Sequence, residues 1–385
     1  MARYRLGDIC MIISGSTPKT EVAEYWDGDF KWITPAELND DSYIIEDSAR
    51  KLTALGVQKT GLTPFPAGTI ILSSRAPIGK VAIAGCEMYC NQGFKNLICS
   101  EIVHNKYLFW YLKGKTEYLN SLGRGATFKE ISKQIVGGIE IELPPMEEQI
   151  AIAQRFEQLN LLLHERKQEI TMLDQLIKAR FVEIFGDILS GYTYPKKRLS
   201  DVVTVGSSKR IFAAEYVNEG IPFYRSKEIR ELGSGLKPSV ELYISPDRYD
   251  EIKKHSGIPK RGDILIAAIG ATIGYSWIVN TDEPFYYKDG NLLILSISDK
   301  VNPVFLNHVM AILIDDYKTK GAAGSAQLAL TIEKVEKMEI PYPPVSVQDE
   351  FATFVSQADK SKLTIQASLD QLETLKQSLM QKYFG

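Results

Sequence analysis

The sequence predicts an α+β fold: two mixed α/β domains joined by two long antiparallel coiled-coil helices, with a pseudo-twofold internal repeat. Three observations predict it. The chain of 385 residues repeats itself once, end to end. The last part of each copy carries an uninterrupted seven-residue apolar pattern, which is typical of paired helices. The rest of each copy mixes short strand and helix patterns, which is typical of a globular domain.

The repeat has a drifting part and a fixed part. Leu143–Gln149 reads LPPMEEQ, and Tyr342–Gln348 reads YPPVSVQ at an offset of 199 residues. The offset stays fixed from there to a closing Phe-Gly pair, at Phe185 in one copy and Phe384 in the other. Upstream it drifts from 193 to 195. Loops tolerate insertions whereas packed helices do not, so the drifting part indicates domains and the fixed part indicates helices.

This division predicts four segments along the chain: a domain at 1–145, a long helix at 146–186, a second domain at 187–344 and a C-terminal long helix at 345–385. Pro145 suits a first helical turn because its missing N–H is not needed there. Gly186 supplies a C-terminal stop. At 1.5 Å per residue, each helix would be on the order of 55–60 Å long.

The heptad pattern defines a seam on each helix. Besides the apolar positions named below, the seam of the first helix includes Arg166, Arg180 and Ile184. The seam of the second helix likewise includes Ala358, Lys362, Lys376 and Tyr383. We expect the helices to pair with each other, antiparallel because a whole domain lies between them; the alternative is that each docks separately on its own domain. The apolar seam positions are Ile152, Phe156, Leu159, Leu163, Ile170, Leu173, Ile177, Phe351, Val355, Ile365, Leu369, Leu372 and Leu379.

Within the domains the sequence predicts short elements at matched positions. Strands are expected on both sides of a tight turn in each copy, helices follow, and a short strand precedes each proline pair. The expected strands are 70–72 with 81–84, 264–266 with 275–279, 139–143 and 338–342, and the expected helices are 108–119 and 305–317.

Composition sets the class of protein. An apolar fraction of 44% and a charged fraction of 24% are typical of globular proteins. No apolar run is long enough for a membrane span, and the first residues lack the apolar core of a signal peptide, so we expect a cytoplasmic protein. The four cysteines lie in the first copy, which favours free thiols. A net charge of −3 means that any phosphate contact must come from a local basic cluster.

No catalytic motif is complete in either copy. Ser74–Val81 resembles a P-loop only in part, because Val81 stands where Ser or Thr would hold magnesium. The residues before the proline pairs, Leu143 and Tyr342, cannot hold the amino group of a base as a methyltransferase motif would. The four histidines show no metal-binding spacing. The sequence therefore predicts a non-enzyme without a metal site.

Several motifs in order carry a resemblance over the whole chain. Besides the two Pro-Pro-x-x-x-Gln signals, they are GSTPKT at 15–20, WITPAEL at 32–38 and SRAPIG at 74–79. Together they resemble the specificity (S) subunit of type I restriction–modification systems. The resemblance implies two target-recognition domains, at 1–145 and 187–344, that each read one half of a split DNA site around an unread spacer.

The resemblance also implies partners. The long helices would set the spacer and dock two modification subunits, which bring S-adenosylmethionine and methylate adenine. Restriction subunits can join and bring ATP and magnesium. No cofactor would bind this chain directly, and no membrane partner is implied. Alternatives are a specificity module of a related fused or two-subunit restriction enzyme, a coiled-coil scaffold without a DNA role, and a stand-alone methyltransferase.

Base reading favours Arg and Lys for guanine and Asn and Gln for adenine, carried on loops that reach the major groove. Arg75 aligns near Ile269, so the second domain is expected to lack that arginine. Different side chains at matched positions are expected if the domains read different half-sites. The candidate DNA-binding residues are Lys19, Arg75, Asn91, Gln92, Arg124 and Lys129 in the first copy, and Lys209, Arg210, Arg225, Lys227, Lys288 and Gln327 in the second.

Overall fold

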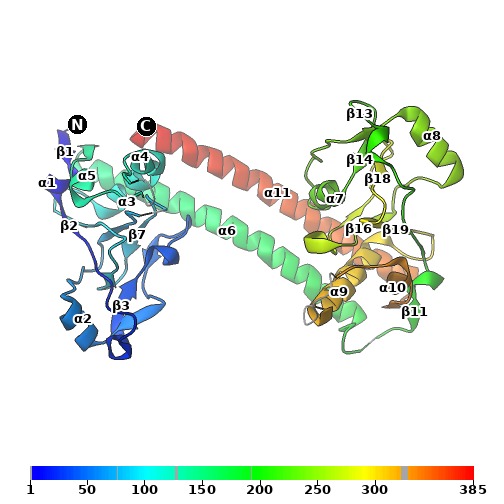
Figure 1. Cartoon of the computed structure of the whole chain (residues 1–385), viewed down its shortest axis with the longest axis horizontal. Helices are drawn as coiled ribbons and strands as arrows, with labels where there is room; N and C mark the ends of the chain where they lie inside the picture. Colours follow the sequence, from blue (N-terminus) through cyan, green and yellow to red (C-terminus); the bar gives the residue numbers. More distant parts are fainter. Residues whose placement is uncertain (1, 76, 126–128, 192, 322–327) are drawn as a thin grey trace. The chain divides into compact units, whose positions relative to one another are not determined.

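The computed structural model describes residues 2–75, 77–125, 129–191, 193–321 and 328–385. The chain forms two compact units. Unit 1 comprises Met1–Gln168 and Gln366–Gly385, and unit 2 comprises Glu169–Ile365. The boundaries fall inside the two long helices, α6 (Met146–Phe185) and α11 (Val345–Phe384), so each unit contains the N-terminal half of one long helix and the C-terminal half of the other (Figure 1).

Unit 1 is built on a five-stranded sheet in the order β2-β9-β6-β7-β4. A second sheet has the order β5-β3-β8, and β1 pairs antiparallel with β10. The strands are β1 (Ala2–Arg5), β2 (Cys10–Ile13), β3 (Trp26–Ile33), β4 (Ile44–Ile45), β5 (Arg50–Leu52), β6 (Ile70–Leu72), β7 (Val81–Ala84), β8 (Tyr89–Cys90), β9 (Asn96–Cys99) and β10 (Glu140–Leu143). The helices are α1 (Leu6–Ile9), α2 (Ala54–Thr60), α3 (Asn105–Gly114), α4 (Thr116–Ser121) and α5 (Lys133–Gly137), with 3-10 turns at Ala23–Tyr25 and Pro35–Glu37.

Unit 2 repeats this topology except at two sheet edges, where among its described residues it has no counterpart of β4 and gains one strand in the second sheet. Its sheets have the orders β12-β19-β16-β17 and β13-β15-β14-β18, and β11 pairs antiparallel with β20. The strands are β11 (Lys196–Arg198), β12 (Thr204–Gly206), β13 (Tyr216–Val217), β14 (Ile221–Tyr224), β15 (Tyr243–Ile244), β16 (Ile264–Ala267), β17 (Ser276–Ile278), β18 (Tyr286–Tyr287), β19 (Leu292–Ser296) and β20 (Glu339–Pro341). The helices are α7 (Ser226–Gly233), α8 (Pro246–His255), α9 (Pro303–Gly321) and α10 (Ile332–Glu336), with 3-10 turns at Leu199–Asp201, Ala213–Glu215 and Gly270–Thr272.

The expected strands around each tight turn are present as antiparallel pairs, β6 with β7 and β16 with β17. The strands expected before the proline pairs are also present, as β10 and β20. One expectation needs correction: the helix expected at 108–119 is two helices, α3 and α4, because the chain leaves helical geometry at Lys115, where ψ is 19°.

In unit 1 the N-terminal part of α6 and the C-terminal part of α11 run side by side (Figure 1). Phe156 stacks on Phe384, with ring centroids 5.6 Å apart. Further from these ends, Lys376 donates a hydrogen bond to Asn160 at 3.3 Å. The contacting residue on α11 moves from 384 back to 376 as the residue on α6 moves from 156 to 160, so the two helices are antiparallel. The same helix faces also pack into the domain core, where Trp110 of α3 stacks on Phe156.

Unit 2 repeats this packing with the helices exchanged. Phe185 of α6 packs edge to face on Phe351 of α11, with centroids 5.5 Å apart, and also contacts Phe305 of α9. Lys362 pairs with Asp174 at 2.8 Å. Each helix end therefore both pairs with the other helix and docks on a domain, so the two interpretations of the heptad pattern hold together.

All thirteen apolar seam residues are buried or half-buried. The pattern is wrong only in the last turns. Phe181 and Phe185 are buried where the heptad places Arg180 and Ile184, and Phe384 is more buried than Tyr383. The reason is that these turns face a domain core on one side as well as the partner helix, which moves the buried stripe by one residue.

The repeated glutamine of the proline-pair motif has a defined structural role. Gln149 is 1% exposed; its amide accepts a hydrogen bond from the His104 N–H at 2.9 Å and donates to the Pro144 carbonyl at 3.0 Å. Gln348 makes the same pair of bonds, to the Asn302 N–H at 2.8 Å and to the Pro343 carbonyl at 2.9 Å. The glutamine therefore ties the start of a long helix to the start of α3 or α9.

Candidate nucleic-acid interface

Five loops of unit 1 are joined by hydrogen bonds into one cluster. The N–H of Ser74, in the turn after β6, donates to the Gly93 carbonyl at 2.7 Å, and the Ile131 N–H donates to the Ser74 carbonyl at 2.9 Å. The Asn91 N–H donates to the Ile33 carbonyl at 3.1 Å. The Thr17 hydroxyl adds the loop that follows β2 by donating to Gln92. We call residues 14–20, 33–37, 74–75, 77–79, 91–95, 123–125 and 129–131 loop cluster 1.

Unit 2 contains the same backbone frame. The Ala268 N–H donates to the Asn291 carbonyl at 2.8 Å, and the Leu330 N–H donates to the Ala268 carbonyl at 2.8 Å. The Lys288 N–H donates to the Tyr224 carbonyl at 2.9 Å. These three bonds match those of Ser74, Ile131 and Asn91 in turn. The equivalent loops, 207–212, 224–228, 268–274, 288–291 and 328–330, form loop cluster 2.

The structure brings the six candidates of the first copy into loop cluster 1. Asn91 accepts a hydrogen bond from the Gly93 N–H at 2.9 Å, and Arg124 exchanges two backbone hydrogen bonds with Glu130, at 3.0 and 2.9 Å. Lys19, Gln92, Arg124 and Lys129 are exposed, and Arg75 is exposed over 44% of its side chain. Their contact with DNA stays a prediction.

Five candidates of the second copy lie in loop cluster 2, where carboxylates accompany three of them. Arg225 lies 2.8 Å from the buried Glu228 and 2.9 Å from Glu241, which Lys227 also contacts at 2.7 Å. Hydrogen bonds from Lys227 and Arg225 lower the pKa of Glu241 to about 2.

The remaining candidates of loop cluster 2 are more loosely held. Arg210 lies 3.8 Å from Asp289, and the backbone N–H of Lys209 donates to the Tyr286 hydroxyl at 2.7 Å. Gln327 lies outside the described residues.

Sequence reasoning missed two charged residues of loop cluster 1. Lys95, whose side chain is 9% exposed, lies 3.1 Å from Glu130 and donates to the Ser74 hydroxyl at 3.2 Å. Glu130 also binds Arg75, with 2.9 Å between its carboxylate and Nε. The sequence did offer one signal. Lys95 lies beside Phe94 and two residues before Leu97, and a lysine that is buried in this way needs a carboxylate partner.

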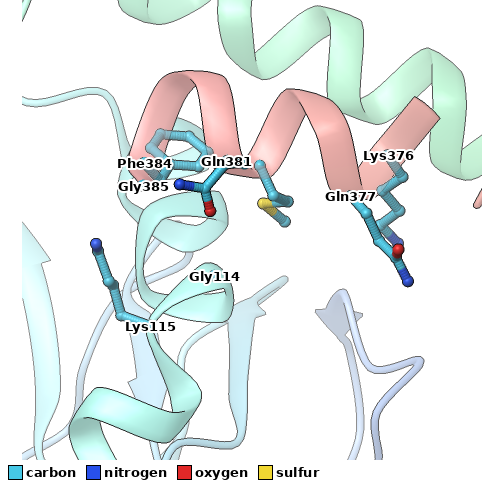
Figure 2. A pocket seen from close by; sticks show the side chains of 8 residues that line it. Gly114, Lys115, Lys376, Gln377, Gln381, Phe384 and Gly385 are labelled. Carbon is cyan, nitrogen blue, oxygen red and sulfur yellow. The ribbon is translucent and has the colours of Figure 1, made fainter. Parts of the chain in front are cut away.

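Unit 1 has two surface hollows in different places. One is lined by Lys95, Arg124 and Glu130 of loop cluster 1 and by Lys133 at the start of α5. The other lies where α11 ends beside Gly114, and Figure 2 shows Lys115, Lys376 and Phe384 around it.

Among the described residues no cluster of His, Cys, Asp and Glu could hold a metal ion. In that same part of the chain no helix is both long and apolar enough to cross a membrane.

Comparisons with known proteins agree with the duplicated architecture. The type I restriction modification DNA specificity domain model matches residues 1–172 and again 193–374. The MjaIX specificity subunit of Methanocaldococcus jannaschii is 29% identical over 98% of this chain and 91% of its own. The EcoprrI specificity subunit of Escherichia coli is 21% identical over 97% and 90%.

Solved structures share the fold. The S subunit of a type I restriction–modification system from M. genitalium aligns over 100% of this chain and 96% of its own, with a TM-score of 0.60 at 16% identity. A chain from a structure of type I restriction–modification complex assembly aligns over 100% and 97%, with a TM-score of 0.63 at 18% identity. The chain belongs to the type I restriction–modification DNA specificity family and contains two copies of its specificity domain.

Proposed function

We propose that this chain is the specificity subunit of a type I restriction–modification complex in which each loop cluster reads one half of a split DNA site. One observation carries the proposal: the two clusters share a backbone frame but carry different side chains. Asn91 stands where the second copy has Lys288, and Arg75 stands where it has Ile269. A conserved frame with exchanged side chains suits two sites of different sequence.

The chemistry would come from partner subunits. Two modification subunits would supply S-adenosylmethionine and methylate the DNA, and restriction subunits would supply ATP and magnesium. This chain would contribute recognition and no catalytic group, and the complex would act in the cytoplasm on double-stranded DNA. An S-adenosylmethionine binding measurement on the isolated chain tests the division of labour, and we expect no binding.

Exposed leucines on the long helices support docking of two equal partners. Leu176 of α6 is 50% exposed, and Leu375 of α11, 199 residues later, is 48% exposed. Exposed apolar side chains on a helix are candidate contacts for another protein. We expect Leu176→Asp or Leu375→Asp to leave a complex with one modification subunit instead of two, measured by native mass spectrometry. Leu236→Asp, at a leucine that is 61% exposed and lies outside the long helices, is the control.

The helix pair would also set the spacer. Each long helix has 40 residues, about 60 Å at 1.5 Å per residue. Seven residues inserted after Gln168 and again after Ala367, which are equivalent positions, add about 10 Å, or roughly three base pairs. We expect the spacer to lengthen while both half-sites stay the same. An altered half-site would contradict the proposal that the helix pair sets the spacer.

Long-read methylation mapping of a host with and without this gene tests the whole proposal. The expected result is one split motif that is methylated only when the gene is present. Methylation that does not depend on the gene would favour the scaffold alternative. Copurification with a nuclease–methyltransferase fusion instead of separate subunits would favour the fused-enzyme alternative.

A further inference from the structure

One ion network distinguishes the two loop clusters. In loop cluster 1 a single carboxylate, Glu130, binds Arg75 and Lys95 through different oxygens, at 2.9 and 3.1 Å. Strand register and the matched β-bridges give the equivalent positions in unit 2, because Arg75 bridges to Glu130 as Ile269 bridges to Ala329. Lys95, which precedes β9, matches Leu293 of β19. The first copy therefore has three charges where the second has Ile269, Leu293 and Ala329.

The members of this network differ in access to solvent. The Lys95 side chain is 9% exposed, Glu130 33% and Arg75 44%. Lys95 also donates a hydrogen bond to the Ser74 hydroxyl, so its ammonium group already has two partners inside the domain. Arg75 is the most exposed of the three side chains.

The geometry leaves the end of Arg75 available. Glu130 accepts its hydrogen bond from Nε, and no other described residue accepts one from the two terminal nitrogens of Arg75. A guanidinium has five N–H donors in a fixed fork, so holding Nε fixes the direction of the remaining donors.

The charge balance also favours an anionic or acceptor-rich ligand at Arg75. Two cations share one carboxylate, so the network keeps a net positive charge. Burial acts to raise the pKa of Glu130, but hydrogen bonds from Lys95 and Arg75 outweigh it and keep the pKa below its ordinary value. Because Lys95 offsets Glu130, the carboxylate can position Arg75 without cancelling its charge.

We propose that Arg75 reads a guanine in the half-site of the first domain and that Glu130, supported by Lys95, is the residue that positions it. This inference rests on the proposed function. Guanine presents two acceptors, O6 and N7, in the major groove, and an arginine fork binds both at once. A phosphate would accept the same fork without sequence preference, and that contact is the rival outcome of the test.

The test uses the assembled complex and methylation mapping. Arg75→Ala should make one G·C position of one half-site degenerate, with discrimination at that position falling about tenfold or more. The other half-site should be unchanged and serves as the internal control for folding and assembly. Arg3→Ala, at an exposed ion-paired arginine of the same unit, is the matched control and should leave both half-sites intact.

The positioning role needs a readout of its own. Glu130→Gln combined with Lys95→Met removes both inner charges, so that no unpaired ammonium group stays buried. This variant should relax the same G·C position, and by less than Arg75→Ala. Added to Arg75→Ala, it should cause no further relaxation there, because Glu130 acts only through Arg75.

Three results would overturn the inference while leaving the proposed function in place. They are a wild-type motif with no G·C pair in either half-site, an Arg75→Ala map identical to wild type, and uniform weakening at all sites with both half-sites retained, which would assign Arg75 to a phosphate. A wild-type complex that methylates no split motif would instead reject the proposed function itself.

Discussion

The two loop clusters share a backbone frame but place their buried charge on different loops. Loop cluster 1 builds its ion network on the turn after β6, around Glu130. Loop cluster 2 is apolar there and builds its network at the start of α7, where Arg225 meets Glu228 and Glu241. The frame uses main-chain bonds that any side chain allows, so each copy is free to place charge where its own target requires.

The largest expected effect breaks one unit and spares the other. Phe384→Ala should destabilise unit 1, and Phe185→Ala should destabilise unit 2, each by about 3–5 kcal/mol, because each ring fills a core where helix and domain meet. Hydrogen exchange should locate the loss in one unit at a time. Equal loss in both units would show that they unfold together.

The next effect compares the two buried glutamines. Gln149→Leu and Gln348→Leu should each cost about 2–4 kcal/mol, because a buried backbone N–H and carbonyl lose their partners. The cost should be greater at Gln149, which also donates to the Ile102 carbonyl at 3.1 Å. Denaturant unfolding measures both, with the exposed Gln158→Leu as a control that should change stability very little. A larger loss of stability for Gln348→Leu than for Gln149→Leu would contradict the idea that the extra hydrogen bond of Gln149 makes it the more important residue.

A smaller effect tests whether the ion network contributes to stability or only to recognition. Glu130→Ala alone should cost about 1–3 kcal/mol, because Lys95 loses its carboxylate. Arg75→Ile with Lys95→Leu and Glu130→Ala copies unit 2 and should fall within about 1 kcal/mol of wild type. Urea unfolding compares the two variants. If the triple variant is as unstable as the single one, loop cluster 1 cannot accept the apolar packing of loop cluster 2.

The smallest effect concerns pH. Burial lowers the pKa of His308 below its ordinary 6.5. The unfolded chain then binds the proton more readily, so unit 2 should lose stability as pH falls from about 6.5 towards the lowered folded pKa. His308→Phe should remove this part of the pH dependence, measured as urea midpoints between pH 5 and 8. Burial also lowers the pKa of His104 in unit 1, so only the variant separates the two units.

The sequence predicted the fold well because its signals are local and periodic. The start of α6 follows from Pro145 and its end from Gly186, whose φ is +79°. The tight turns were predictable for the same reason, since Gly79 and Gly274 both have positive φ. The shifted stripe at Phe181 and Phe185 was not predictable from the heptad, because it depends on the domain core that the helix end meets.

The candidate interface was predictable only in part. Motif spacing placed residues such as Arg75 and Asn91 on the correct loops, but it could not pair Arg75 with Glu130, which lies 55 residues further along the chain. Charge alone also gave no means of separating Arg124, which has no ion pair among the described residues, from Arg225, which has two carboxylate partners. Partnering is a property of the folded chain.

The division of the helices between the units also orders events in time. Unit 2 is one continuous stretch of chain, whereas unit 1 needs Gln366–Gly385 to complete it. During synthesis, Phe156 must therefore wait for Phe384 until the whole of unit 2 has been made. The first domain to be synthesised becomes the last to be completed, and the chain must close a loop of more than two hundred residues to do so.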